Sequence, residues 1–409
     1  MPYLRRHGLL LLLIMIGFAL RVYLLNDVTL SPDERNVTNE FLEIPLSDLL
    51  QTTTRHGFPE HLFAGILIWA SYRLGWQLFI LRWPGILFSV LTLAVIYKLT
   101  KKILGWPAAL AATALLSLSY YHIFFSHQIR GYAEVVFFAV LSFFFLWQAM
   151  KEQQKKDWIL FALTSALGIY NQFYSATLLA TQGIIVAAWL ALRAFQQRPK
   201  LTPFFRQQVM PPLMAGVGSL VIAALLFAAM LPQFFRNFAA ADSDFTTSPT
   251  SLTNTLFPYY FLFYQYSGAL SVWSVILYLS LILVGVVYLF RVKPEVAGVL
   301  LGWLIIPLLL VVLGQTFVSW FYVRERYLIY LLPAFIILVA AGWVGLGQGL
   351  KKINFTLGAS YFWVSSIPLT VMSLVSIFIY LKTATVGNWQ DTADFFAKNA
   401  LPTDMIVCE

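Results

Sequence analysis

The sequence has few charged residues and a single cysteine. Only 11% of its 409 residues are charged, against about 25% in soluble domains. The one cysteine, Cys408, excludes a disulfide framework and a cysteine-based metal cluster. Apolar residues make up 60% of the chain, so little polar surface is left to keep a folded domain in water. The composition therefore excludes a soluble protein and indicates one that lies in a membrane.

Continuous apolar runs recur along the chain, each long enough to cross about 30 Å of hydrocarbon. They do not have the ten-residue alternation of outer-membrane barrels. We therefore predict an all-α polytopic membrane protein with eleven transmembrane helices. The predicted spans are residues 8–25, 83–99, 108–125, 132–150, 158–170, 175–192, 213–231, 271–290, 296–314, 328–346 and 361–381.

Lysine and arginine set the predicted orientation. The first run follows Arg5 and Arg6 and has no small-residue cleavage site after it, so we interpret it as an uncleaved helix with its N-terminus inside. The net charge of +9 then lies mainly in the inner connections, as the positive-inside rule requires, and it does not indicate a nucleic-acid partner. An odd number of spans places the C-terminus outside.

One apolar segment, residues 62–81, is ambiguous because Arg73 and Gly75 interrupt it. Counting it as a span would move Lys101 and Lys102 to the outer side, against the positive-inside rule. We predict instead a juxtamembrane helix on the outer face.

The predicted organisation is one transmembrane domain, residues 1–386, whose first outer loop covers 26–81. Long loops in compact proteins are usually functional or disordered, so this loop directs the search for chemistry to the outer face. Residues 387–409 change in character and predict the start of a truncated outer soluble α/β domain.

The first candidate site is the sequence Ser31-Pro32-Asp33-Glu34, just outside the first span. A serine followed by proline and, at the third position, glutamate is a typical helix start, which requires no catalysis. The same two carboxylates could supply a general base at the membrane surface. The two interpretations are compatible, because a helix start also fixes Asp33 in place.

Arginines beside aromatic residues form two further candidates on the outer side. Arg130 and Tyr132 lie in a tight turn between two spans, and Arg324, Arg326 and Tyr327 precede a late span. These arginines could extend to lipid headgroups, or their guanidinium groups could bind a phosphate. The sequence leaves both alternatives open.

Histidines on the outer side are candidates for contact with an acceptor or with a divalent cation. The residues considered are His61, Glu60 and His127. Their spacing matches no metal-binding motif, and structural histidines are commoner. We therefore expect no cofactor and no metal, with a divalent cation as the alternative.

Four motifs of the sequence together resemble those of the GT-C glycosyltransferase superfamily. Within it, the chain is similar to bacterial relatives of protein O-mannosyltransferases and of the lipid A aminoarabinose transferase. The matching sequences are Asp33-Glu34, Leu81-Arg82-Trp83-Pro84-Gly85-Ile86-Leu87-Phe88, His127-Gln128-Ile129-Arg130-Gly131-Tyr132 and Arg326-Tyr327-Leu328. The chain has Phe58-Pro59-Glu60-His61-Leu62 where relatives often have His-Pro-Pro-Leu, and Asn171-Gln172 where they often carry a histidine.

The resemblance implies an inverting hexosyl- or pentosyltransferase of the bacterial plasma membrane. It would move a sugar from a polyprenyl-phosphate donor to a lipid, glycan or protein acceptor on the outer face. Asp33 would be the base and Glu34 would orient it or hold the acceptor. Arg130, Arg324 and Arg326, with Tyr132 and Tyr327, would bind the donor phosphate. The alternative from another class is a polytopic transporter, or a flippase for lipid-linked sugars without transferase chemistry.

Overall fold

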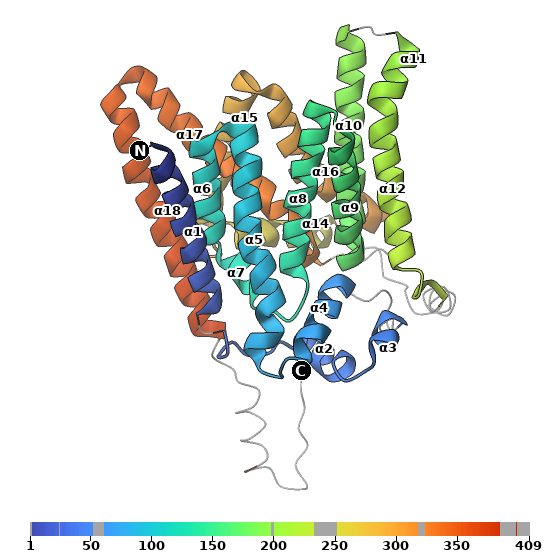
Figure 1. Ribbon diagram of the computed structural model, residues 1–409. Helices are drawn as coiled ribbons and strands as arrows, with labels where there is room; N and C mark the ends of the chain where they lie inside the picture. Colours follow the sequence, from blue (N-terminus) through green and yellow to red (C-terminus); the bar gives the residue numbers. More distant parts are fainter. Residues whose placement is uncertain are drawn as a thin grey trace.

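A computed structural model describes residues 2–23, 25–51, 61–197, 200–232, 252–317, 324–384 and 398. Throughout these ranges the regular structure is helical and contains no strand, as the apolar runs predict (Figure 1). The predicted outer domain of residues 387–409 lies, except for Lys398, outside the described residues, and so does Glu60.

Each of the eleven predicted runs falls largely in a helix. The helices are α1 (Pro2–Val22), α5 (Leu78–Leu104), α6 (Trp106–Ser117) with α7 (Tyr120–Ser126), α8 (Tyr132–Glu152), α9 (Lys155–Asn171), α10 (Ala176–Gln197), α12 (Met210–Leu226), α15 (Val272–Val292), α16 (Pro294–Phe317), α17 (Leu332–Ile353) and α18 (Phe355–Ala384). Within the described ranges, eight spans are long and apolar enough to cross a membrane, and the bent pair α6–α7 makes a ninth. The count of eleven stays a prediction, because the apolar part of α1, His7–Val22, is shorter and α9 has only 17 residues.

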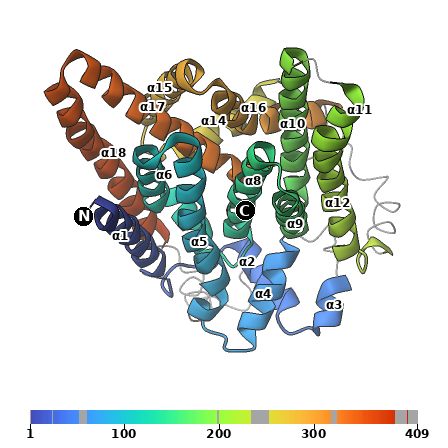
Figure 2. The ribbon, with the colours of Figure 1, turned by 45° about the horizontal axis from the view of Figure 1, so that its top comes forward.

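Short helices gather at one end of the bundle. They are α2 (Pro32–Phe41), α3 (Leu46–Gln51) and α4 (Leu62–Tyr72), and both Figure 1 and Figure 2 place them at the same end. The segment predicted as one juxtamembrane helix divides into α4 and the first turn of α5. With 11 residues, α4 is too short to cross about 30 Å of hydrocarbon. The long connection after α12 contains another helix, α14 (Leu252–Tyr266).

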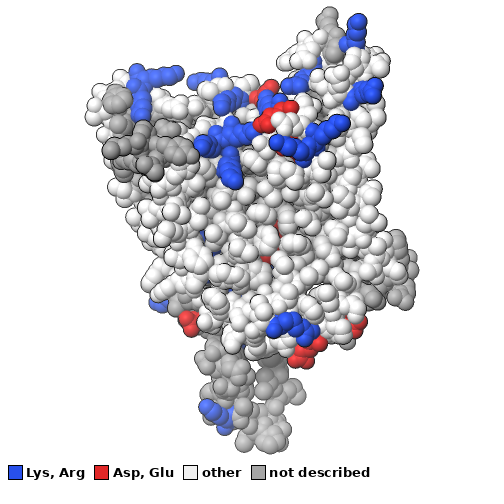
Figure 3. Space-filling model, in the orientation of Figure 1, with Lys and Arg blue, Asp and Glu red and all other residues white. Residues whose placement is uncertain are grey.

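Lysine and arginine side chains gather at the opposite end of the molecule (Figure 3). There Lys102 pairs with Glu152, and Lys151 pairs with Glu295, across neighbouring helices. This distribution agrees with the predicted orientation, in which α2, α3 and α4 lie outside.

Helix α17 is the centre of the bundle and is buried along nearly its whole length. It runs parallel to α15, with Tyr278 stacked on Phe335 at 5.8 Å between ring centroids. The two backbones meet further along, where a Cβ atom on Gly342 would lie 1.9 Å from the Leu281 carbonyl oxygen. Glycine is therefore required at this crossing, and it allows the two helices to approach closely.

The predicted span 108–125 is broken by a bend of 57° between α6 and α7. Broken helices at membrane depth need other groups to satisfy the freed carbonyls. The buried guanidinium group of Arg21 donates to the carbonyl oxygens of Leu116 (3.3 Å) and Ser117 (3.2 Å) and contacts His122 Nδ1 at 2.8 Å. This arrangement fixes α7, and α7 leads directly into the turn that carries Arg130.

Candidate active site

The start of α2 positions both acidic residues of the first motif. Ser31 caps the helix: its Oγ accepts a hydrogen bond from the Glu34 amide (3.3 Å), and its own amide donates to Glu34 Oε2 (2.8 Å). The capping box expected from the sequence is therefore present. It holds Asp33 in the first helical turn, where the N-terminal end of a helix favours negative charge.

Glu34 is buried, with 2% of its surface exposed, and is bonded on both oxygens. Besides the contact with Ser31, its Oε1 accepts from the Ile129 amide at 2.8 Å and lies 3.6 Å from Arg82 Nη2. Arg82 in turn donates to the carbonyl oxygens of Leu25 (2.5 Å) and Val28 (2.8 Å). Glu34 and Arg82 thus join the outer loop to α5 and to the turn after α7.

Asp33 meets two arginines that are distant in sequence. Its Oδ2 lies 2.6 Å from Arg130 Nη1 and 2.8 Å from Arg326 Nη2. The Asp33 side chain is 38% exposed, whereas that of Arg130 is 8% exposed. Arg324 is an exposed residue just before the 3-10 helix η4 (Glu325–Leu331), and among the described residues Arg326, not Arg324, makes the ion pair with Asp33.

Asn171, at the end of α9, contacts the turn that carries Arg130. Its Nδ2 donates to the Gly131 carbonyl oxygen at 2.8 Å, and its Oδ1 accepts from the Ala64 amide at 3.1 Å. A Cβ on Gly131 would lie 2.8 Å from the Cβ atoms of both Ala64 and His61, so only glycine fits there. The sequence motifs did not identify Asn171 as a residue of the site, although it stands where relatives often carry a histidine.

His61 begins α4 in a strained backbone conformation with φ of 68°. Its buried ring lies edge-on to Tyr132, at 4.4 Å between centroids, and neither ring nitrogen has a hydrogen-bond partner among the described residues. Burial, together with the positive charges of Arg130 and Arg326, holds the pKa of the imidazole well below its usual range. His61 is therefore neutral at physiological pH.

The other predicted acceptor or metal candidate, His127, lies apart from this cluster. Its Nε2 is 2.9 Å from the Arg21 carbonyl oxygen, to which it donates, and its Nδ1 is 2.7 Å from the Tyr380 hydroxyl. These contacts join α1 to α18. Within the described ranges, no three His, Cys, Asp or Glu side chains are close enough to hold a metal ion.

Aromatic rings flank both arginines. The Arg130 guanidinium lies 5.6 Å from the centre of the Tyr132 ring, and that of Arg326 lies 5.8 Å from the Tyr327 ring. Tyr327 stacks on Tyr174, which belongs to η1 (Phe173–Ser175), at 5.0 Å between centroids. The rings form apolar walls around the charged groups, and contacts between arginine and aromatic faces hold the guanidinium planes in place.

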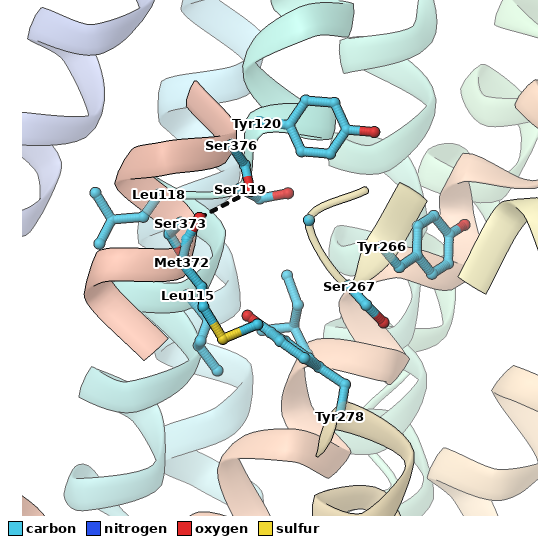
Figure 4. Close-up of a pocket in the computed structure, with 12 residues that line it drawn as sticks. Leu115, Leu118, Ser119, Tyr120, Tyr266, Ser267, Tyr278, Met372, Ser373 and Ser376 are labelled. Carbon is cyan, nitrogen blue, oxygen red and sulfur yellow. Dashed lines mark hydrogen bonds between the residues drawn. The ribbon is translucent and has the colours of Figure 1, made fainter. Parts of the chain in front are cut away.

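A small pocket lies elsewhere, between α6, α14, α15 and α18 (Figure 4). Tyr120, Tyr266 and Tyr278 line it, together with the hydroxyl groups of Ser267 and Ser373. Its lining residues include none of the charged cluster around Asp33. The pocket is therefore a separate feature of the bundle.

Comparisons with known proteins agree with this architecture. Residues 60–205 match the model of the dolichyl-phosphate-mannose-protein mannosyltransferase family. ArnT from Cupriavidus metallidurans is 13% identical and covers 97% of this chain and 81% of its own, with a TM-score of 0.59 bound to undecaprenyl phosphate and 0.63 in the apo state.

A second similar structure is AglB from Archaeoglobus fulgidus, an archaeal oligosaccharyltransferase in complex with an inhibitory peptide and a dolichol-phosphate. It is 12% identical, and the alignment covers 97% of this chain and 58% of AglB, with a TM-score of 0.56. No curated protein sequence matches the chain.

The chain therefore has the polytopic fold of the GT-C superfamily, and its resemblance to GT-C glycosyltransferases is confirmed. Within that class, the segment from α4 to the start of η2 (Phe205–Val209) matches the mannosyltransferase family model. This segment carries Arg130, one of the two arginines that contact Asp33, together with Tyr132 and Asn171.

Proposed function

We propose that the protein transfers a sugar from a polyprenyl-phosphate donor to an acceptor at the outer face of the bacterial plasma membrane. The observation that carries this proposal is the meeting of one carboxylate and two guanidinium groups from three distant segments. Transfer of a sugar from a phosphate leaving group requires a base for the acceptor proton and, beside it, cationic groups that bind the phosphate.

In the proposed reaction Asp33 accepts the proton of the acceptor hydroxyl or amine. The acceptor oxygen or nitrogen bonds to the anomeric carbon while the bond from that carbon to the phosphate oxygen breaks. The electron pair leaves with the polyprenyl phosphate, and attack opposite the leaving group inverts the anomeric centre. Arg130 and Arg326, with Arg324 at the edge of the site, stabilise the negative charge that develops on the phosphate. For comparison, a single oxyanion donor contributes about 2.7–4 kcal/mol in enzymes that use one.

The remaining predicted residues support this chemistry. Glu34 orients Asp33, because its bonds to Ser31 and Ile129 fix the start of α2 against the turn that carries Arg130. Tyr132 and Tyr327 orient the two guanidinium groups. His61 is the proposed acceptor contact. Both of its ring nitrogens are buried, so this contact requires the side chains around the ring to open, and the neutral imidazole adds no positive charge to the site.

A lipid-linked donor explains why the site stands on a helical bundle in the membrane. Nucleotide sugars are cytoplasmic, so a transferase that acts on the outer side needs a donor carried by the bilayer. In this proposal residues 1–386 form one catalytic domain, and the acceptor is a lipid, a glycan or a protein. The sugar is a hexose or a pentose.

The experiment that tests the proposal compares the full chain with Asp33→Asn. Purified protein in lipid is incubated with radiolabelled polyprenyl-phosphate sugars, and transfer or hydrolysis products are measured. Loss of the base is expected to lower the rate roughly 10²- to 10⁴-fold. The control is Asp27→Asn, which removes an exposed carboxylate of the same loop and is expected to keep full activity.

Retained activity in Asp33→Asn would remove Asp33 as the base. Movement of the labelled lipid between leaflets by the native chain, with no product, would support the flippase alternative instead. Unfolding midpoints of both variants show whether either change acts through stability.

A further inference from the structure

The two arginines of the site converge on one atom, Asp33 Oδ2. Arg130 Nη1 approaches it to 2.6 Å and Arg326 Nη2 to 2.8 Å. Charge-assisted bonds from two guanidinium groups make this the position where an anion gains most.

We propose that the Asp33 carboxylate and the phosphate of the lipid carrier compete for this position. Binding of the phosphate then displaces Asp33, and the displaced carboxylate turns toward the acceptor. This inference rests on the proposed function, in which Arg130 and Arg326 bind the donor phosphate. It adds that donor binding and release of the base are one event.

The contrast between the two neighbouring carboxylates supports this inference. Glu34 is buried and is held by the backbone amides of Ser31 and Ile129, so it cannot move without unmaking the capping box. Asp33 is 38% exposed, and among the described residues its side chain is bonded only to the two arginines. Rotation of one short side chain therefore frees Asp33 while the helix start stays in place.

An order of binding follows from the competition. While both arginines bind Asp33 Oδ2, the carboxylate is held toward them and is not turned toward an acceptor. The donor therefore binds first and the acceptor second. This order also keeps Asp33 bonded to the two arginines until a donor sugar is bound and can be attacked by the acceptor.

The test measures binding, not catalysis. The full chain in lipid nanodiscs is titrated with a polyprenyl monophosphate, and the dissociation constant is compared with that of Asp33→Ala. Removal of the competing carboxylate is expected to tighten binding roughly five- to tenfold. Asp27→Asn removes one negative charge from an exposed position of the same loop and is expected to leave the constant unchanged.

Inorganic phosphate and the neutral polyprenol complete the test. Asp33→Ala is expected to bind both inorganic phosphate and polyprenyl monophosphate more tightly than the native chain does, because the competition concerns the phosphate group. Its affinity for polyprenol is expected to be unchanged. Equal or weaker phosphate binding by Asp33→Ala would overturn the inference, and so would an equal gain in Asp27→Asn. Should Asp33→Ala fail to fold, Asp33→Asn is measured in its place with the same expectation.

Two further variants separate this inference from the proposed function. Arg130→Ala and Arg326→Ala are expected to weaken phosphate binding. If neither does, the phosphate role of the arginines fails. If both do while loss of the Asp33 carboxylate brings no gain, only the competition fails.

Discussion

At the residue scale, two adjacent carboxylates with nearly the same chemistry have different environments. Glu34 points into the protein and accepts from the Ser31 and Ile129 amides, while Asp33 points outward to two guanidinium groups. The difference arises from the helix start, which turns the two side chains in different directions. In the proposed function Glu34 therefore fixes the helix start, and Asp33 is left for the reaction.

The two arginines near η4 are expected to differ in importance. Arg326→Ala removes an ion pair with Asp33 and is expected to raise KM for the lipid-linked donor about tenfold or more, since a bond to a charged group contributes roughly 1.5–3 kcal/mol. Arg324→Ala removes an exposed side chain at the rim and is expected to have a smaller effect. Steady-state kinetics on both variants check this, and equal effects would show that Arg324 takes an equal part in binding the phosphate.

His61 is expected to make the protein less stable in acid. Its folded-state pKa lies well below 6.5, so below that pH the unfolded chain takes up a proton that the folded chain refuses. Stability is therefore complete above about pH 6.5 and falls as the pH drops, by at most about 1.4 kcal/mol per pH unit for this group. The unfolding midpoints measured at pH 7.5 and pH 5.5 should differ less in His61→Asn than in the native chain. His7→Asn, which replaces an exposed histidine, should leave this difference between the two midpoints as it is in the native chain.

At the element scale, the parallel pair α15 and α17 determines the shape of the core. Their backbones touch at two glycines, where a Cβ on Gly285 would meet the Leu338 carbonyl oxygen at 2.4 Å and one on Gly342 would meet that of Leu281 at 1.9 Å. Close backbone approach replaces the large side chains that usually separate helices. The 3-10 helix η4, which carries Arg326, leads directly into α17, so the packing of this buried helix positions the arginine.

A methyl group at this crossing is expected to destabilise the bundle. Gly342→Ala forces α15 and α17 apart and should cost about 1–3 kcal/mol or more, as overpacked cores do. Gly349→Ala, on the same helix with nothing within 4 Å of its Cβ, is the matched control and should be neutral or slightly stabilising. Thermal unfolding in detergent measures both, and equal midpoints for the two variants would contradict the backbone contact.

Hydrophobic runs predicted the helices well, because length and apolarity alone decide which segments can cross a bilayer. The bend between α6 and α7 was not predictable, since it depends on Arg21 reaching carbonyls from another helix. The division of residues 62–81 between α4 and α5 was not predicted either. Arg73 and Gly75 mark the interruption in the sequence, but they do not show that the apolar residues after them, 78–81, begin the next helix.

The sequence indicated several residues of the candidate site but not their contacts. The motifs indicated Asp33, Arg130 and Arg326, yet only the three-dimensional arrangement shows that Arg326, not Arg324, bonds to Asp33. Asn171 and Arg82 act through backbone groups of other segments, and such contacts leave no pattern in one sequence. His127 stood among outer polar residues in the sequence, but it joins α1 to α18 away from the cluster.

At the scale of the whole molecule, the bundle has a basic end and an end covered by α2, α3 and α4 (Figures 1 and 3). In the proposed orientation the basic end faces the cytoplasm, and the reactive carboxylate stands at the opposite headgroup layer. The donor and the acceptor must then both reach this layer.

The contacts of Glu34 and Arg82, which join the outer loop to α5, have a further consequence for the choice of substrate. In the proposed function these contacts hold the start of α2 in place, so we expect an acceptor to be selected by how far its nucleophile stands from the bilayer. Bulky partners and small ones are then equally acceptable when they present a nucleophile at that level.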